Sequence, residues 1–111
     1  MKALFFVLNK EELLEEILET FLELNISGAT IVDSVGMGSI LSRDIPIFAG
    51  FRNLLEGSRP ANKLIVTVLP DNDVETVIQG IEMVVGSLND PGNGIAFIIP
   101  VDGCYGLKSS F

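Results

Sequence analysis

Two glycine-flanked triplets are the residues of this chain whose types and spacing best suit ligand chemistry. The first is Gly36, Met37 and Gly38, and the second is Gly92, Asn93 and Gly94. Because glycine has no Cβ, backbone N–H groups in such a turn can closely approach a phosphate or a nucleotide. Turns favour glycine in any case, so each triplet by itself also fits a purely structural role.

Three arginines and a stripe of apolar side chains lie between the triplets, within residues 39–62. Arg43, Arg52 and Arg59 are candidates for contact with an anion or for docking of a partner, although exposed loop charges are commonly just solvated. Phe48 and Phe51, with the two leucines that follow, recur at helical spacing. Such a stripe either covers a junction between subunits or binds a partner.

Catalytic chemistry is poorly supported by the residue types. The chain has no histidine, so it has no imidazole base, no Ser-His triad and no histidine metal ligand. The glutamates of residues 11–23 fill the solvent-exposed face of a predicted helix. Asp33 has no evident partner for acid–base catalysis. Cys104 has no neighbouring histidine and no second cysteine to activate it. We therefore predict a protein that is not an enzyme.

Composition narrows the class further. The chain has 111 residues, which indicates a single domain, and 48% of them are hydrophobic, which supplies a core. A net charge of −8, with seven basic residues, disfavours nucleic acid as a partner. The lone cysteine excludes an internal disulfide, and no segment is long and apolar enough to cross a membrane. We expect a cytoplasmic protein without membrane insertion.

Hydrophobic periodicity predicts four strands and two helices. The strands are expected at residues 2–8, 29–35, 63–69 and 95–99, and the helices at about 9–24 and 72–86. Asn9 with Glu12, and Asn72 with Glu75, have the spacing of capping boxes. The order β-α-β-β-α-β predicts an α+β domain of the ferredoxin-like type, a four-stranded antiparallel sheet with both helices on one face.

A long connection separates the second and third predicted strands. Residues 39–62 have no clean period, and 42–46 read as loop, whereas 48–56 are compatible with a short helix. A connection of this length inside a compact domain is usually functional. We expect it to be the surface that meets a protein partner.

The predicted strands are apolar on both faces. In the first strand Leu4, Phe6 and Leu8 point to one side, while Phe5 and Val7 point to the other. Two helices cover only one face, so the other face would leave large apolar side chains in water, each worth roughly 1.5–3 kcal/mol when buried. We therefore predict that the open face is buried against other subunits, unless the tail and the long connection cover it.

Three segments together match a known family in order and spacing. They are residues 26–38 (ISGATIVDSVGMG), 63–81 (KLIVTVLPDNDVETVIQGI) and 92–101 (GNGIAFIIPV). On these segments the chain resembles the PII-type nitrogen regulatory proteins and their PII-like relatives, and the similarity covers most of the chain outside residues 39–62. The resemblance implies a single PII-like domain, residues 1–111. The resemblance implies a homotrimer with inward-facing sheets and ATP or ADP bound between subunits. It also implies a T-loop, here residues 39–62, that docks on enzymes, regulators or membrane transporters in nitrogen metabolism.

The match includes departures at positions that contact nucleotide in the family. Asn93 stands where the family has an aspartate, and Ile95 stands where it has a lysine. Gly106 and Lys108 stand where the family has an R-x-R pair, so only Lys108 keeps a basic group. The resemblance therefore implies a divergent member whose affinity for ATP or ADP is weakened, or replaced by affinity for another effector.

Two alternatives stay open at this point. An amino-acid-binding regulatory module of the ACT type has the same element order, although its second and third strands are usually joined by a short hairpin. A structural trimer without any ligand has the same open sheet face. The identities of the effector and of the protein partner do not follow from the residues.

Overall fold

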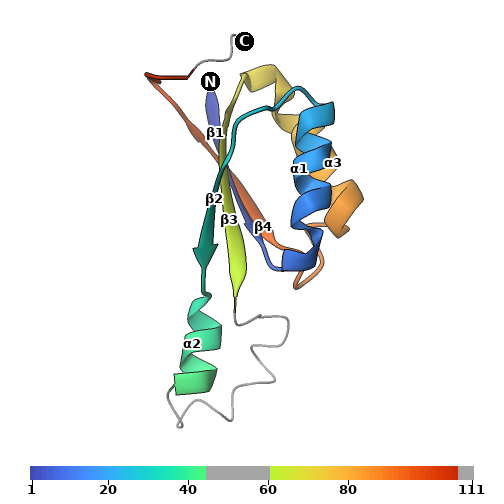
Figure 1. Ribbon diagram of the computed structural model, residues 1–111, viewed down its shortest axis with the longest axis vertical. Coiled ribbons are helices and arrows are strands. Elements are labelled where there is room, and N and C mark those ends of the chain that lie inside the picture. Colours follow the sequence, from blue (N-terminus) through green and yellow to red (C-terminus); the bar gives the residue numbers. More distant parts are fainter. Residues whose placement is uncertain (45–60, 108–111) are drawn as a thin grey trace.

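The computed structural model describes residues 1–44 and 61–107. Four strands form one antiparallel sheet in the order β2-β3-β1-β4 (Figure 1). Their bounds are β1 Lys2–Leu8, β2 Thr30–Ser34, β3 Asn62–Leu69 and β4 Ile95–Pro100. This order confirms the ferredoxin-like α+β fold that periodicity predicted.

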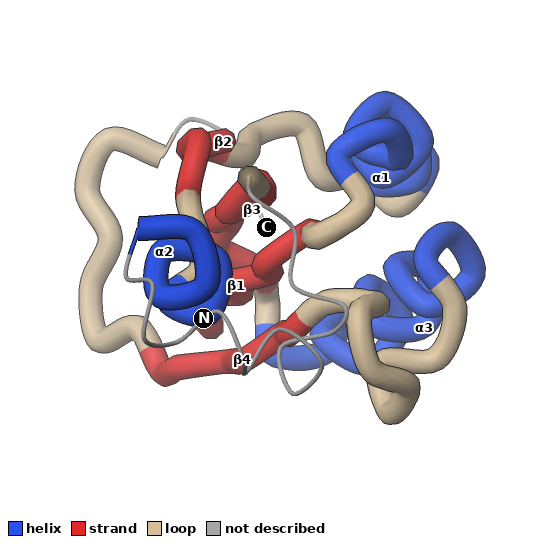
Figure 2. The backbone as a smooth tube through the Cα atoms, turned by 90° about the horizontal axis from the view of Figure 1, so that it is seen from below, coloured by secondary structure: helices blue, strands red, loops and turns tan. Residues whose placement is uncertain are grey.

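Two long helices cover one face of this sheet. They are α1, Leu14–Glu23, and α3, Val74–Val85, and both lie on the same side of the strands (Figures 1 and 2). Each follows a short 3-10 turn, η1 at Glu11–Leu13 and η3 at Asp71–Asp73. Neither Asn9 nor Asn72 is the N-cap residue that the capping boxes predicted: the N-caps are Lys10, Leu13, Pro70 and Asp73, and none of their side chains makes a capping hydrogen bond. The 3-10 turns displace the helix starts, and the side chain of Asn9 bonds elsewhere.

The core lies between the helices and the covered face of the sheet. Alternate residues of β1 and β3 point into it and meet one side of each helix, as period-two strands and amphipathic helices require. Its fully buried members are Leu4, Phe6, Leu8, Ile17, Phe21, Ile65, Leu69, Val77, Ile81 and Val85.

The start of the long connection differs from the prediction. A third helix, α2 at Met37–Asp44, extends beyond the end of β2 (Figure 1), so residues 39–44 are helical rather than loop. Residues 36–38 begin this helix instead of forming a turn, since the Ile40 N–H donates to the Gly36 carbonyl at 3.2 Å. The missed signal was Met37, Ile40 and Leu41, whose spacing is helical. At the other end Asn62 already belongs to β3.

Several predicted partner residues have little or no structural description. Arg43 lies on α2, where only its backbone is described. Phe48, Phe51, Arg52 and Arg59 lie outside the described residues. Their proposed role in partner binding stays a prediction.

The second face of the sheet is open and apolar, as the alternation predicted. Phe97 is 48% exposed and Ile95 is 63% exposed, although both lie in a strand of a regular sheet. The rings of Phe5 and Phe97 stack across β1 and β4 with centroids 5.0 Å apart. Residues of this face are Phe5, Val7, Val32, Leu64, Val66, Val68, Ile95, Phe97 and Ile99, and we call it the open face.

We expect Gly94→Ala to destabilise the protein by about 1–3 kcal/mol. Gly94 has φ +122°, and an added Cβ would lie 2.6 Å from the carbonyl oxygen of Val7. Equilibrium urea unfolding measures the change. Gly28→Ala is the matched control, because a Cβ there meets nothing within 4 Å. Equal stability of the two variants would contradict this account of the turn.

Candidate functional site

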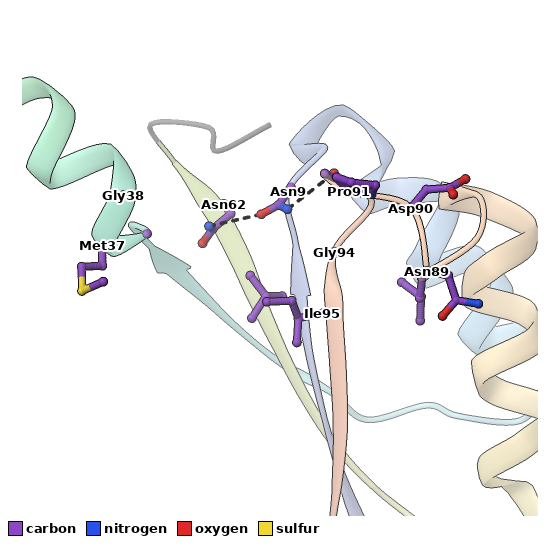
Figure 3. A pocket seen from close by; sticks show the side chains of 13 residues that line it. Asn9, Met37, Gly38, Asn62, Asn89, Asp90, Pro91, Gly94 and Ile95 are labelled. Carbon is purple, nitrogen blue, oxygen red and sulfur yellow. Dashed lines mark hydrogen bonds between the residues drawn. The ribbon is translucent and has the colours of Figure 1, made fainter. Parts of the chain in front are cut away.

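A pocket of about 490 Å³ opens at the end of the sheet where β1 ends and β3 begins. Its walls are the start of α2 on one side and the turn between α3 and β4 on the other (Figure 3). This volume is typical of small-molecule sites. The lining residues are Val7, Asn9, Gly36, Met37, Gly38, Asn62, Leu88, Asn89, Asp90, Pro91, Gly92, Gly94 and Ile95.

The fold brings together most of the ligand-binding residues proposed from the sequence. Residues 36–38 come from the start of α2, while Gly92 and Gly94 come from the turn before β4. Gly92 and Gly94 have positive φ values of 84° and 122°, which glycine adopts without strain. Ligand binding by these residues stays a prediction, but their proximity was not evident from the chain order.

Of the two remaining proposed residues, Asn93 is not among the described residues that line this pocket. The side chain of Asn93 accepts a hydrogen bond from Lys10 Nζ at 2.9 Å and donates one to the Ser87 carbonyl at 2.8 Å. Asn93 therefore ties the turn before β4 to Lys10 and to the residues that follow α3. Lys108 lies outside the described residues.

A chain of hydrogen bonds runs from the end of β2, across the start of β3 and the residue after β1, to the turn before β4. Ser34 Oγ, at the end of β2, donates to Oδ1 of Asn62 on β3. The Nδ2 of Asn62 donates to Oδ1 of Asn9 at 3.5 Å, and the Nδ2 of Asn9 donates to the Gly92 carbonyl at 3.5 Å (Figure 3). We call Ser34, Asn62, Asn9 and Gly92 the amide ladder. It joins the segment that leads into α2 to the turn before β4.

Sequence reasoning missed the amide ladder. Asn9 was assigned to a helix cap, and Asn62 was assigned to the connection. Both are polar residues at the boundary of an apolar strand, which is the signal that was available. Asn62 is only 6% exposed, and a buried amide needs hydrogen-bond partners. Only the strand register shows which partners these are.

The charges around the pocket are acidic rather than basic. Among the described residues that line it, Asp90 carries the only charge. Lys10 is engaged with Asn93 and with the Val85 carbonyl at 3.3 Å. Lys63 pairs with Asp33 and with Glu11, and its hydrogen bond to Asp33 is the main reason why the pKa of its ammonium is raised.

This lining is a poor fit for the phosphates of ATP or ADP. The side chain at the family's lysine position is Ile95, which lines the pocket without charge. Gly106 is exposed and does not line the pocket. None of the described lining residues carries a basic side chain, whereas a polyphosphate needs charge-assisted partners.

Within the described residues, no cluster of three or more His, Cys, Asp or Glu side chains is suitable for a metal ion. The described helices include none that is long and apolar enough to cross a membrane.

Asn89 and Asp90 are exposed at the pocket rim and are its remaining polar side chains outside the amide ladder. The arrangement offers a place for a small molecule to bind.

The described residues form a small α+β domain with a pocket of about 490 Å³ at one end of its sheet. A family model, Nitrogen regulatory protein P-II, matches residues 1–110. The chain therefore belongs to the P-II nitrogen regulatory protein family, whose members are regulatory rather than catalytic. A comparison with curated proteins found no match.

We expect Asn62→Ala to lower the free energy of unfolding by about 1–3 kcal/mol, because it removes the side-chain amide that bonds both Ser34 Oγ and Asn9 Oδ1. Thermal or urea unfolding measures the loss. Asn89→Ala is the matched control: Asn89 lines the same pocket, but its side chain is exposed. The amide ladder would be structurally unimportant if both variants were equally stable.

Proposed function

We propose that this chain is a homotrimeric signal-transduction protein that senses a small effector and acts on a protein partner through residues 39–62. The observation that carries the proposal is the composition of the pocket. One wall is the turn before β4, and the other is the start of α2, which leads directly into the connection. An effector in this pocket would contact the segment that positions the partner surface.

The trimer is supported by the open face. Its exposed members include Ile95, Phe97 and Ile99, and the stacked pair of Phe5 and Phe97 extends the apolar surface onto the central strand β1. A contiguous apolar surface of this kind on a regular sheet is typical of a protein interface. Membership of the P-II family favours three subunits, since its members act as trimers on protein targets.

The remaining parts of the proposal follow from charge and family. A net charge of −8 disfavours nucleic acid as the partner, so we propose a protein target. That target can be a soluble protein or a membrane protein. We propose a cytoplasmic location and a role in nitrogen metabolism, both on the strength of the family. The ACT-type alternative is less well supported, because β2 and β3 are separated by α2 and the connection. A trimer without any ligand remains the second candidate.

We expect Phe97→Lys to convert the trimer to monomers, because it places a charge in the centre of the proposed interface. Sedimentation velocity at micromolar concentration measures the change in mass. Met83→Lys is the matched control, since Met83 is 88% exposed on α3, away from the open face.

A trimer that survives Phe97→Lys, or a wild-type protein that sediments as a monomer, would contradict the interface. A monomeric Met83→Lys variant would show that added charge, rather than its position, dissociates the subunits.

We expect replacement of residues 45–60 by a short glycine-serine linker to abolish partner binding while the trimer stays intact. The reason is that α2 and β3 are kept, so the pocket and the open face keep their residues. Crosslinking in cells followed by mass spectrometry compares the proteins captured by the two forms. Identical captured proteins would exclude the connection as the partner surface.

A further inference from the structure

We propose that a groove beside the outer edge of β2 docks an extended, basic segment of a partner protein, with one large apolar side chain in the groove and cationic side chains along α1. The groove has a volume of about 240 Å³. Its lining comes from apolar side chains of α1, from residues 26–29 and from Ile31 of β2. It shares no described lining residue with the pocket at the start of α2. Docking at this groove is therefore independent of the proposed function.

The groove lies on the helix-covered side of the sheet. Ile31 pairs with Ile65 across β2 and β3, and the side chains of directly opposed residues point to the same side. Ile65 is fully buried in the core, so Ile31 also points to the side on which α1 and α3 lie (Figure 2). Ile31 is nevertheless 40% exposed, and β2 is the outermost strand. Burial of the open face between subunits therefore does not occupy this side of the sheet.

The size and the lining of the groove suit one large side chain. Its volume is below the roughly 300–1,000 Å³ that is common for small-molecule sites. The described lining has no charged residue, and Leu22 is 65% exposed there. Phe21 belongs to the core, which fixes the apolar wall in place. Exposed apolar side chains that gather around a groove, rather than singly, indicate a binding surface.

The helix face beside the groove is acidic. Glu15 and Glu19 lie three residues before Leu18 and Leu22, respectively, so these side chains share one face of α1. Both glutamates are exposed, and neither takes part in an ion pair between described residues. The sequence of α1 contains no basic residue. This face attracts cationic side chains of a partner and repels anionic ones, which commits the occupant to basic residues.

The strand β2 offers an open edge beside the groove. It is the end strand of the sheet order, and among the described residues only β3 pairs with it. Its sequence, TIVDS, contains no lysine and no proline, the residues that commonly block an edge strand. An extended segment that adds to such an edge gains main-chain hydrogen bonds, and every second side chain points to the same side. A large apolar residue with basic residues two positions before and after it therefore fits the edge, the groove and α1 together.

Fluorescence anisotropy with labelled synthetic peptides tests this inference. The probe is a capped peptide of alternating lysine and threonine in which the central lysine is replaced by leucine. We expect the wild-type protein to bind this leucine peptide at least about tenfold more tightly than the same peptide with a central alanine, which leaves the groove unfilled. A peptide with glutamate in place of each lysine should not bind, and added salt should weaken binding of the leucine peptide. No binding of the leucine peptide at millimolar concentration, or equal binding of the alanine peptide, would overturn the inference.

Variants of α1 locate the binding site. We expect Leu22→Lys to weaken binding of the leucine peptide at least about tenfold, because it places a cation at the groove. Met83→Lys is the matched control: Met83 is exposed on α3, outside the groove, so binding should stay within about twofold of the wild type. Glu19→Gln should weaken binding about threefold at low ionic strength and have little effect at high ionic strength. Unchanged binding by Leu22→Lys and Glu19→Gln, or equal losses in the two lysine variants, would refute docking at the groove.

A second copy of this chain is the competing occupant of the groove. Sedimentation velocity of the same variants decides between the two occupants. We expect Leu22→Lys to keep the sedimenting mass of the wild type, since the open face is unchanged. A smaller mass for Leu22→Lys, but not for Met83→Lys, would show that the groove is an interface between subunits and would overturn docking of a partner. If Leu22→Lys does not fold, the salt dependence of Glu19→Gln, which replaces an exposed side chain, decides instead.

Discussion

The structure depends on the alternation of side chains along β1, the inner strand between β3 and β4. Leu4, Phe6 and Leu8 fill the core under α1 and α3, and Phe5 and Val7 point to the other side. Because two helices cover only one face of a four-stranded sheet, every apolar residue on the second face needs another partner. This constraint accounts for both the stability of the domain and its proposed assembly.

The candidate site lies at one end of the same sheet. Antiparallel pairing of β1 with β3 and β4 brings Asn9, Asn62 and the turn before β4 to one end, where the amide ladder links them. The pocket lies beside this ladder, and α2 begins at its edge. The pocket and the start of α2 are therefore adjacent at one end of the sheet.

Sequence patterns were reliable where local physics is decisive. Alternation located the four strands within a residue or two, and helical spacing located α1 and α3, because both patterns follow from backbone geometry. The sequence patterns failed where the same residues are compatible with two different local structures. Asn9 and Glu12 have the spacing of a capping box, but the chain enters α1 through a 3-10 turn. Gly36 and Gly38 suggested a turn, whereas the apolar spacing of Met37, Ile40 and Leu41 leads into a helix.

By itself, the sequence determined the fold class, the two-faced sheet and the absence of histidine chemistry, because these depend on residue types and on their period along the chain. It also showed a resemblance that the family match over residues 1–110 confirms. Only the tertiary structure decided that residues 36–38 and the turn before β4 line one pocket, and that the side chain of Asn93 bonds to Lys10 and Ser87 instead. It also decided that Asp90 is the charged residue of the described lining. The reason is that these segments lie some fifty residues apart, and strand register alone sets which of their side chains meet.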